Sequence, residues 1–92
     1  MGLTFEWDPR KATSNRKKHG VCFEEGATAF ADPLSLTIAD PDHSEEGERF
    51  LLLGLSHRAR LVVVTHTESG ERIRIISARL ASALERKGYE EE

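Results

Sequence analysis

The sequence has 92 residues, of which 38% are hydrophobic and 32% charged, and its formal net charge is −3. This length suits one domain spanning residues 1–92, and the composition is that of a globular protein rather than a disordered or fibrous one. The only cysteine, Cys22, excludes an intrachain disulfide, and apolar runs as short as Phe50–Leu53 exclude a membrane-spanning helix. We therefore expect a cytoplasmic protein with no membrane association.

Charge is unevenly distributed along the chain. Residues 9–19 hold five basic side chains and no acid, whereas residues 40–48 hold five acids and no lysine or arginine. The basic segment is a candidate contact for RNA or for a protein partner. The alternative is ordinary solvated surface charge, since basic residues near a helix C-terminus are favoured by the helix dipole alone.

The first half of the chain predicts a strand and two helices. Leu3–Trp7 alternates apolar and polar residues, which is typical of a strand with one buried face. Asp8-Pro9 is a helix start and Gly20 a helix end, so a helix is expected over 9–19. Apolar residues at helical spacing predict a second helix over Cys22–Ala31.

Four further strands are expected, joined by short turns and therefore antiparallel. In the last of them, alternation predicts one face with Ile73, Ile75, Ser77 and Arg79 and the other with Arg72, Arg74, Ile76 and Ala78. The predicted strands cover Leu34–Ile38, Arg49–Ser56, Arg60–His66 and Glu71–Arg79.

Ser82 and Glu85 form a capping-box pattern, which predicts a C-terminal helix ending near Tyr89. The expected fold class is thus α+β: a short N-terminal strand, two helices, a four-stranded antiparallel sheet and a C-terminal helix.

The residues favour chemistry without a metal or cofactor. The sequence has no glycine-rich phosphate loop and no nucleophile elbow, and its four histidines lack metal-ligand spacing. Cleavage of RNA by its own 2′-hydroxyl needs only a base, an acid and positive charge on the phosphoryl oxygens. Lysine, arginine, histidine, glutamate and tyrosine side chains can supply all three.

Candidate roles follow from side-chain chemistry. Glu85 or His19 can accept the proton, and Arg74, Arg79 or Lys18 can hold the phosphoryl oxygens. Tyr89 lies one helical turn after Glu85 and can stack on a base or guide a proton. A structural alternative for Glu85 and Tyr89 is a helix cap with a ring that covers the core, and for Ser77 a buried hydroxyl that satisfies the sheet.

Several of these residues fall in a recognisable series. It begins with Phe5-Glu6-Trp7-Asp8 and Lys18-His19-Gly20-Val21, continues with Arg49 and Gly54, and ends with Ile73–Arg79, Glu85 and Tyr89. The series resembles the BrnT family of type II toxins over nearly the whole chain. Cys22, where relatives often carry serine, and a C-terminal helix with few arginines depart from the family pattern.

The resemblance implies a fold related to the RelE-like ribonucleases and RNA cleavage that blocks translation. It also implies a partner, a BrnA-type ribbon-helix-helix antitoxin, with two copies of each chain in the complex and contact with promoter DNA only through the antitoxin. Position by position, the catalytic candidates are His19, Arg74, Arg79, Glu85 and Tyr89, and the RNA-binding candidates are Lys11, Asn15, Lys18 and Ser77. The alternative is a catalytically weak or silent homologue that serves as an antitoxin-binding module in promoter autoregulation.

Overall fold

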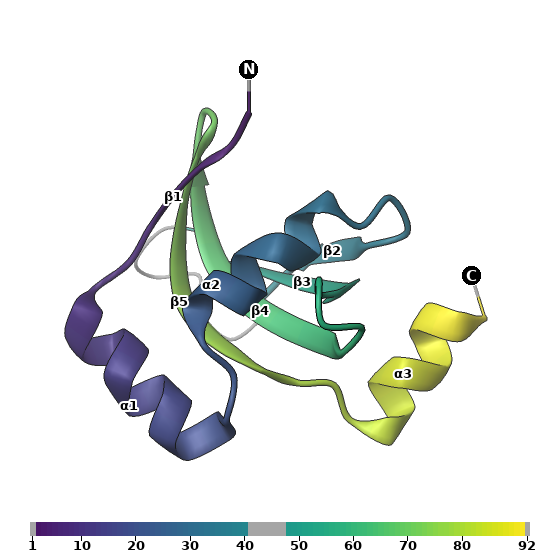
Figure 1. Cartoon of the computed structure of the whole chain (residues 1–92). Coiled ribbons are helices and arrows are strands. Elements are labelled where there is room, and N and C mark those ends of the chain that lie inside the picture. Colours follow the sequence, from purple (N-terminus) through teal and green to yellow (C-terminus); the bar gives the residue numbers. More distant parts are fainter. Residues whose placement is uncertain (1, 41–47, 92) are drawn as a thin grey trace.

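The structure, a computed structural model, describes residues 2–40 and 48–91, so most of the acidic segment 40–48, which the sequence predicts to be a loop, lies outside the described residues. The helices and strands fall close to the ranges expected from the sequence (Figure 1). In chain order they are β1 (Thr4–Glu6), α1 (Pro9–His19), α2 (Phe23–Thr28), the 3₁₀ helix η1 (Ala29–Ala31), β2 (Leu36–Ala39), β3 (Phe50–Leu55), β4 (Leu61–Ser69), β5 (Arg72–Leu80) and α3 (Ala83–Glu90).

The sheet has five strands in the order β1-β5-β4-β3-β2, which confirms the α+β class but not the expected strand count. β2 to β5 form the predicted antiparallel run. β1 joins them as a fifth strand, pairing in parallel with β5 at Arg72–Arg74. Alternation identified β1 as a strand, but it carries no information about a partner that lies about 70 positions away in the chain.

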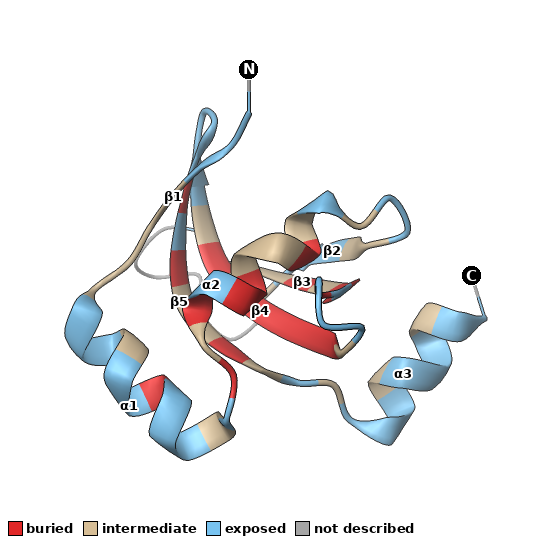
Figure 2. Ribbon diagram, in the orientation of Figure 1, coloured by how far each residue is buried: buried red, intermediate tan, exposed pale blue. Residues whose placement is uncertain are grey.

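One face of the sheet is covered by α2 and η1, α1 lies along the edge of β5, and α3 lies apart at the other end of the molecule (Figures 1 and 2). Phe23 is fully buried in this core, and Trp7 packs against it with ring centroids 5.8 Å apart. Gly54 on β3 allows η1 to approach closely, since a Cβ there would lie 2.9 Å from the carbonyl oxygen of Ala29. The other core residues are Val21, Ala29, Leu52, Val62, Val64, Ile73, Ile75 and Ala78.

α1 is attached to the domain through one buried polar side chain. Its ends match the sequence prediction: Asp8 accepts a hydrogen bond from the Arg10 N–H, and Gly20 takes the left-handed conformation with φ 71°. Asn15 is the only residue of α1 that is buried. Its side-chain nitrogen donates to the carbonyl oxygens of Val21 and Ala78, and its side-chain oxygen accepts from the Ala78 N–H.

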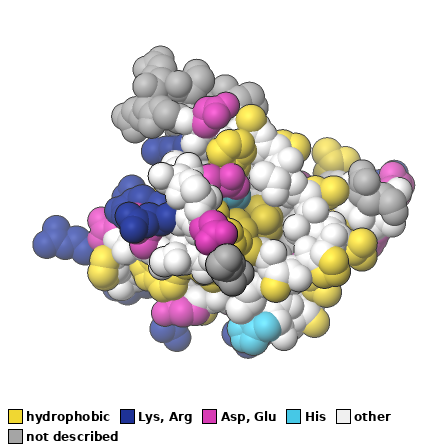
Figure 3. All heavy atoms as spheres, turned by 90° about the horizontal axis from the view of Figure 1, so that it is seen from above, with side chains coloured by type: hydrophobic (Ala, Val, Ile, Leu, Met, Phe, Trp, Pro, Cys, Tyr) yellow, Lys and Arg dark blue, Asp and Glu magenta, His cyan; other side chains and the backbone are white. Residues whose placement is uncertain are grey.

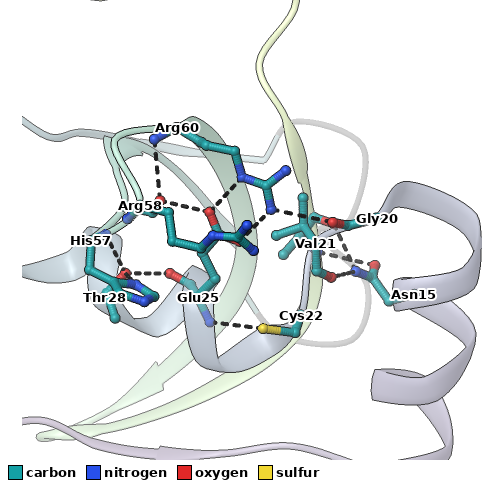
Figure 4. Close-up of polar contacts among 11 residues, drawn as sticks. Asn15, Gly20, Val21, Cys22, Glu25, Thr28, His57, Arg58 and Arg60 are labelled. Atoms are coloured by element: carbon teal, nitrogen blue, oxygen red, sulfur yellow. Dashed lines mark hydrogen bonds and ion pairs between the residues drawn. The ribbon is translucent and has the colours of Figure 1, made fainter.

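A buried ion pair fixes α2 to the turn between β3 and β4 (Figure 4). The Glu25 carboxylate, 1% exposed, accepts hydrogen bonds from the Arg60 guanidinium and from the Ser56 hydroxyl. The hydrogen bonds from Arg60 lower the pKa of Glu25 to about 2, against the opposing effect of burial. Arg60 also donates to the Gly20 carbonyl, so this cluster joins the end of α1 as well.

No helix among the described residues is long and apolar enough to cross a membrane.

Candidate functional site

A β-bulge decides which side chains of β5 face outward. Thr65 pairs with Ser77 and His66 pairs with Ile75, so Ile76 is an extra residue without a partner on β4. The expected alternation therefore fails after Ile75. Ala78 turns into the core, and Ser77 and Arg79 lie on the opposite face from Ile73 and Ile75.

This shift gathers basic residues on the sheet face that α1 and α2 leave uncovered, which we call the open face. Residues opposite one another on paired strands share a face, so Ser77 lies beside Thr65 and Arg79 beside Val63. From one end of β5 to the other, the open face carries Arg72, Arg74, Ser77 and Arg79. Three of these four, Arg74, Ser77 and Arg79, are predicted site residues, and they lie together on one face of the strand.

Arg79 and Glu85 form a bidentate ion pair at the junction of β5 and α3. The two guanidinium nitrogens of Arg79 lie 2.8 Å from the two carboxylate oxygens of Glu85. Glu85 Oε1 also accepts from the Ser82 N–H, which completes the predicted capping box. These hydrogen bonds, that of Arg79 first, lower the pKa of Glu85 to about 2, so the carboxylate is ionised at neutral pH and is a weak proton acceptor.

The other two arginines of the open face are paired more loosely. Nη1 of Arg74 lies 3.3 Å from Oε2 of Glu6 on β1, and Nε of Arg72 lies 3.7 Å from Oε1 of the same carboxylate. Both arginines are about half exposed or more, at 49% and 66%. Pairs of this kind are weak in water, so an incoming phosphate can compete with Glu6 for both guanidinium groups.

A hollow of about 300 Å³ lies between α3 and the open face. Glu85 and Gly88 of α3 form one wall, and side chains of three strands form the floor. The floor residues are Leu36, Ile38, Leu51, Leu53 and Val63.

Tyr89 anchors the end of α3. Its hydroxyl donates to Oδ2 of Asp32, 2.6 Å away, in the segment that follows η1. The hydrogen bond raises the pKa of Tyr89 and lowers that of Asp32. Tyr89 therefore directs its proton toward Asp32 and fastens the end of α3 to the segment after η1.

The candidates on α1 lie along the outer edge of β5. Lys11, Asn15 and His19 are spaced one turn apart, so they share the helix face that Asn15 fixes to Ala78. Asn15 is buried and its amide is fully hydrogen-bonded, so it is not available to RNA. Lys11 and Lys18 are exposed and His19 is partly exposed. Within residues 2–40 and 48–91, no hydrogen bond joins His19 to Arg79 or Glu85.

Sequence reasoning missed three participants. Arg72 was placed on the strand but given no role, although its position two residues before Arg74 puts both on one face. Glu6 and Asp32 were missed because their partners, Arg74 and Tyr89, are 68 and 57 positions away. No local pattern in the sequence signals such pairs.

The described part of the chain contains no group of three or more His, Cys, Asp or Glu side chains placed to hold a metal ion. Lys and Arg side chains gather on one side of the molecule, with Asp and Glu among them, while hydrophobic side chains occupy much of the other side (Figure 3). The site can therefore offer guanidinium groups to an anion and an apolar surface next to them.

Comparisons with known proteins bear on the family and the fold. The family described as the ribonuclease toxin BrnT of type II toxin-antitoxin systems matches residues 7–85. The crystal structure of the Brucella abortus ribonuclease toxin BrnT superposes with a TM-score of 0.63 at 22% identity, covering 87% of this chain and 97% of that one. No curated protein matches the sequence. The likeness in structure confirms the fold, and the match over most of the sequence places the chain in the BrnT family of ribonuclease toxins.

Proposed function

We propose that this chain is a metal-independent endoribonuclease toxin that stops translation by cleaving RNA. The observation that carries the proposal is the open face of β5, where Arg72, Arg74 and Arg79 line one strand beside the Ser77 hydroxyl. Guanidinium groups in a row suit the successive phosphates of a single RNA strand, and their planar fork suits phosphoryl oxygens.

In the proposed reaction the 2′-hydroxyl of one nucleotide attacks the adjacent phosphorus and displaces the 5′-oxygen of the next, which takes a proton from water. The products are a 2′,3′-cyclic phosphate and a 5′-hydroxyl. Arg79 stabilises the charge that builds up on the phosphoryl oxygens, with Arg74 and Ser77 holding the neighbouring part of the strand. Glu85 orients Arg79 through two hydrogen bonds, which is a positioning role. We assign the acceptance of the 2′-hydroxyl proton to His19, because an imidazole nitrogen can act as a general base.

A cleavage assay tests the proposal. Purified protein is incubated with a defined single-stranded RNA, with and without a chelator, and the products are mapped. We expect cleavage in both conditions, and a loss of about a hundredfold or more in rate for Arg79→Ala, because removing one oxyanion-stabilising donor typically costs that much. Arg86→Ala, on the exposed side of α3, is the matched control and keeps the parent rate.

Two results would contradict it. Cleavage that the chelator abolishes would show a metal-dependent reaction, and RNA left intact by the parent protein would remove the nuclease role. Replacement of His19 by alanine tests the base separately: an unchanged rate and pH profile would assign the proton transfer to another group.

The family assignment implies an antitoxin, and we propose a BrnA-type ribbon-helix-helix protein with two copies of each chain. The exposed basic residues of α1, Lys11 and Lys18 among them, are the proposed contact for this partner or for RNA. The complex acts in the cytoplasm and reaches promoter DNA only through the antitoxin. The charge-reversing double variant Lys11→Glu with Lys18→Glu is expected to weaken one of these interactions without changing the fold.

A second candidate function is a silent member of the family that only binds its antitoxin. The ion pairing of the open face favours it, because Arg79 is held by Glu85, both Arg72 and Arg74 face Glu6, and the formal net charge is −3. Toxicity on expression without the antitoxin separates the two: a silent member leaves bacterial growth and messenger RNA unaffected.

A further inference from the structure

The hollow beneath α3 is an apolar site that the reaction described above does not use. Its floor consists of five aliphatic side chains from β2, β3 and β4, and its volume of about 300 Å³ is that of a small ligand pocket. Ile38 of the floor is 60% exposed. An apolar surface that is open beside a basic face suits a ligand that is apolar at one end and anionic at the other.

Among the described residues, Glu85 in the wall and Arg79 beside it bring polar groups to this hollow. Val63 of the floor pairs with Arg79, so the guanidinium lies next to the hollow, and Glu85 forms part of the wall itself. Glu85 Oε1 accepts two hydrogen bonds, from Arg79 and from the Ser82 N–H, whereas Oε2 accepts one, from Arg79. A carboxylate oxygen has two lone pairs, so Oε2 keeps one for a ligand.

We propose that this hollow is a nucleobase subsite, which holds one unstacked base of the RNA whose phosphate Arg79 binds. The inference rests on the proposed function for the identity of the ligand. Unpaired bases are the usual targets of RNA-binding proteins, and pockets for extruded bases hold the ring against aromatic or apolar side chains and read its edge by hydrogen bonds. The aliphatic floor suits the ring of one nucleotide, and the carboxylate of Glu85 suits the polar edge of its base. The guanidinium of Arg79 suits its phosphate.

Glu85 gives the subsite a preference among bases. Its free lone pair accepts from an exocyclic amino group, as glutamate does with N4 of cytosine. Uracil has the same ring size but presents a carbonyl oxygen at that position, which the carboxylate repels. Cytosine is therefore expected to bind more tightly than uracil, and this pair of bases isolates the hydrogen bond from the apolar contact.

Gly88 allows the hollow to be filled without disturbing the fold. It forms part of the wall, and a Cβ added there meets no atom within 4 Å. The substitution Gly88→Leu places an apolar side chain at the hollow. It also favours the helical conformation of α3, because glycine is a poor helix former. Ala83→Leu is the matched control, because it adds the same side chain at an exposed position of α3 that does not line the hollow.

The experiment measures binding of short 2′-O-methyl oligonucleotides, which lack the attacking hydroxyl and are not cleaved. Cytosine, uracil and abasic versions with equal numbers of phosphates are titrated against the parent protein, Gly88→Leu and Ala83→Leu by fluorescence anisotropy. We expect the parent to bind the cytosine version about tenfold more tightly than the abasic one, with uracil between them, because the floor removes part of the ring from water and Glu85 adds a hydrogen bond. Gly88→Leu lowers the cytosine affinity to the abasic level and leaves the abasic affinity unchanged, while Ala83→Leu binds as the parent does.

Three results would overturn the inference. One is equal binding of the cytosine and abasic versions by the parent, and another is a base-dependent affinity that survives in a folded Gly88→Leu protein, as judged by its melting temperature. The third is loss of antitoxin binding in Gly88→Leu with base-dependent affinity intact, which would make the hollow a peptide site. Failure of the nuclease proposal looks different: unmodified RNA stays uncut while base-dependent binding remains.

Discussion

The side-chain amide of Asn15 supplies the hydrogen bonds that the backbone of Ala78 lacks at the outer edge of β5. Among the described strands, β1 pairs with Arg72–Arg74 and does not reach Ala78, whose backbone has no strand partner on that side. Asn15 takes the place of the missing strand, because its amide donates to and accepts from Ala78 in the way a neighbouring backbone would. One residue thereby replaces the broad apolar stripe that α1 does not have.

Substitution of Asn15 by alanine is expected to lower the free energy of unfolding by about 3 kcal/mol, because it leaves buried backbone groups of Ala78 and Val21 without partners. Urea denaturation measures the change. Ser14→Ala, at the exposed neighbouring position, should stay within about 0.5 kcal/mol of the parent. Equal effects of the two substitutions would mean that Asn15 does not fasten α1.

Glu25 makes stability depend on pH. Its pKa in the folded protein is about 2, below the ordinary 4.5, so its stabilising effect is complete above pH 4.5 and is lost as the pH falls toward 2. The loss amounts to about 3 kcal/mol at most. Urea denaturation at pH 7 and pH 3 should show a smaller difference for Glu25→Gln than for the parent, and an unchanged difference would refute the assignment.

At the scale of elements, α3 depends on its two ends for its position. An isolated helix of eight residues is not stable in water, and none of its residues is buried. The Arg79–Glu85 pair holds its first turn and the hydrogen bond from Tyr89 to Asp32 holds its last. The wall of the hollow therefore stands only while both contacts are made.

Tyr89→Phe tests this attachment, because it removes the hydroxyl and keeps the ring. We expect faster amide hydrogen exchange across α3, with a loss of about 1 kcal/mol or less in global stability. Exchange in α1, which Tyr89 does not contact, serves as the internal control. Unchanged exchange in α3 would show that the ring alone holds the helix.

The elements that could be predicted are those with local signals. The ends of α1 and the capping box of α3 follow from residues within a few positions of one another, and the structure confirms them. The Arg79–Glu85 pair also spans only six positions. The parallel pairing of β1 and the contact of Tyr89 with Asp32 depend on distant partners, and the bulge at Ile76 interrupts an alternation that the sequence alone makes look regular.

At the scale of the whole molecule, positive charge is concentrated on the open face and α1 although the net formal charge is −3. Binding of RNA should therefore be strongly dependent on salt. With three arginines of the open face each meeting one phosphate, the logarithm of affinity should fall with the logarithm of salt concentration with a slope of about −2.

Arg72→Ala is expected to reduce that slope by about 0.7, because one phosphate contact is lost. Arg86→Ala, off the open face, should leave the slope unchanged. Anisotropy titrations over a range of potassium chloride concentrations provide the measurement, and a slope unaffected by Arg72→Ala would place the RNA elsewhere on the molecule.

The unpaired residue on β5 also makes the open face tolerant of one very small genetic change. Loss of the codon for Ile76 would restore regular pairing with β4 and leave Ser77 and Arg79 opposite Thr65 and Val63, on the face that they already occupy. An in-frame deletion of these three nucleotides would then keep the arginines of the open face in line. A selection for harmless variants should therefore recover replacements of the arginines but not this deletion.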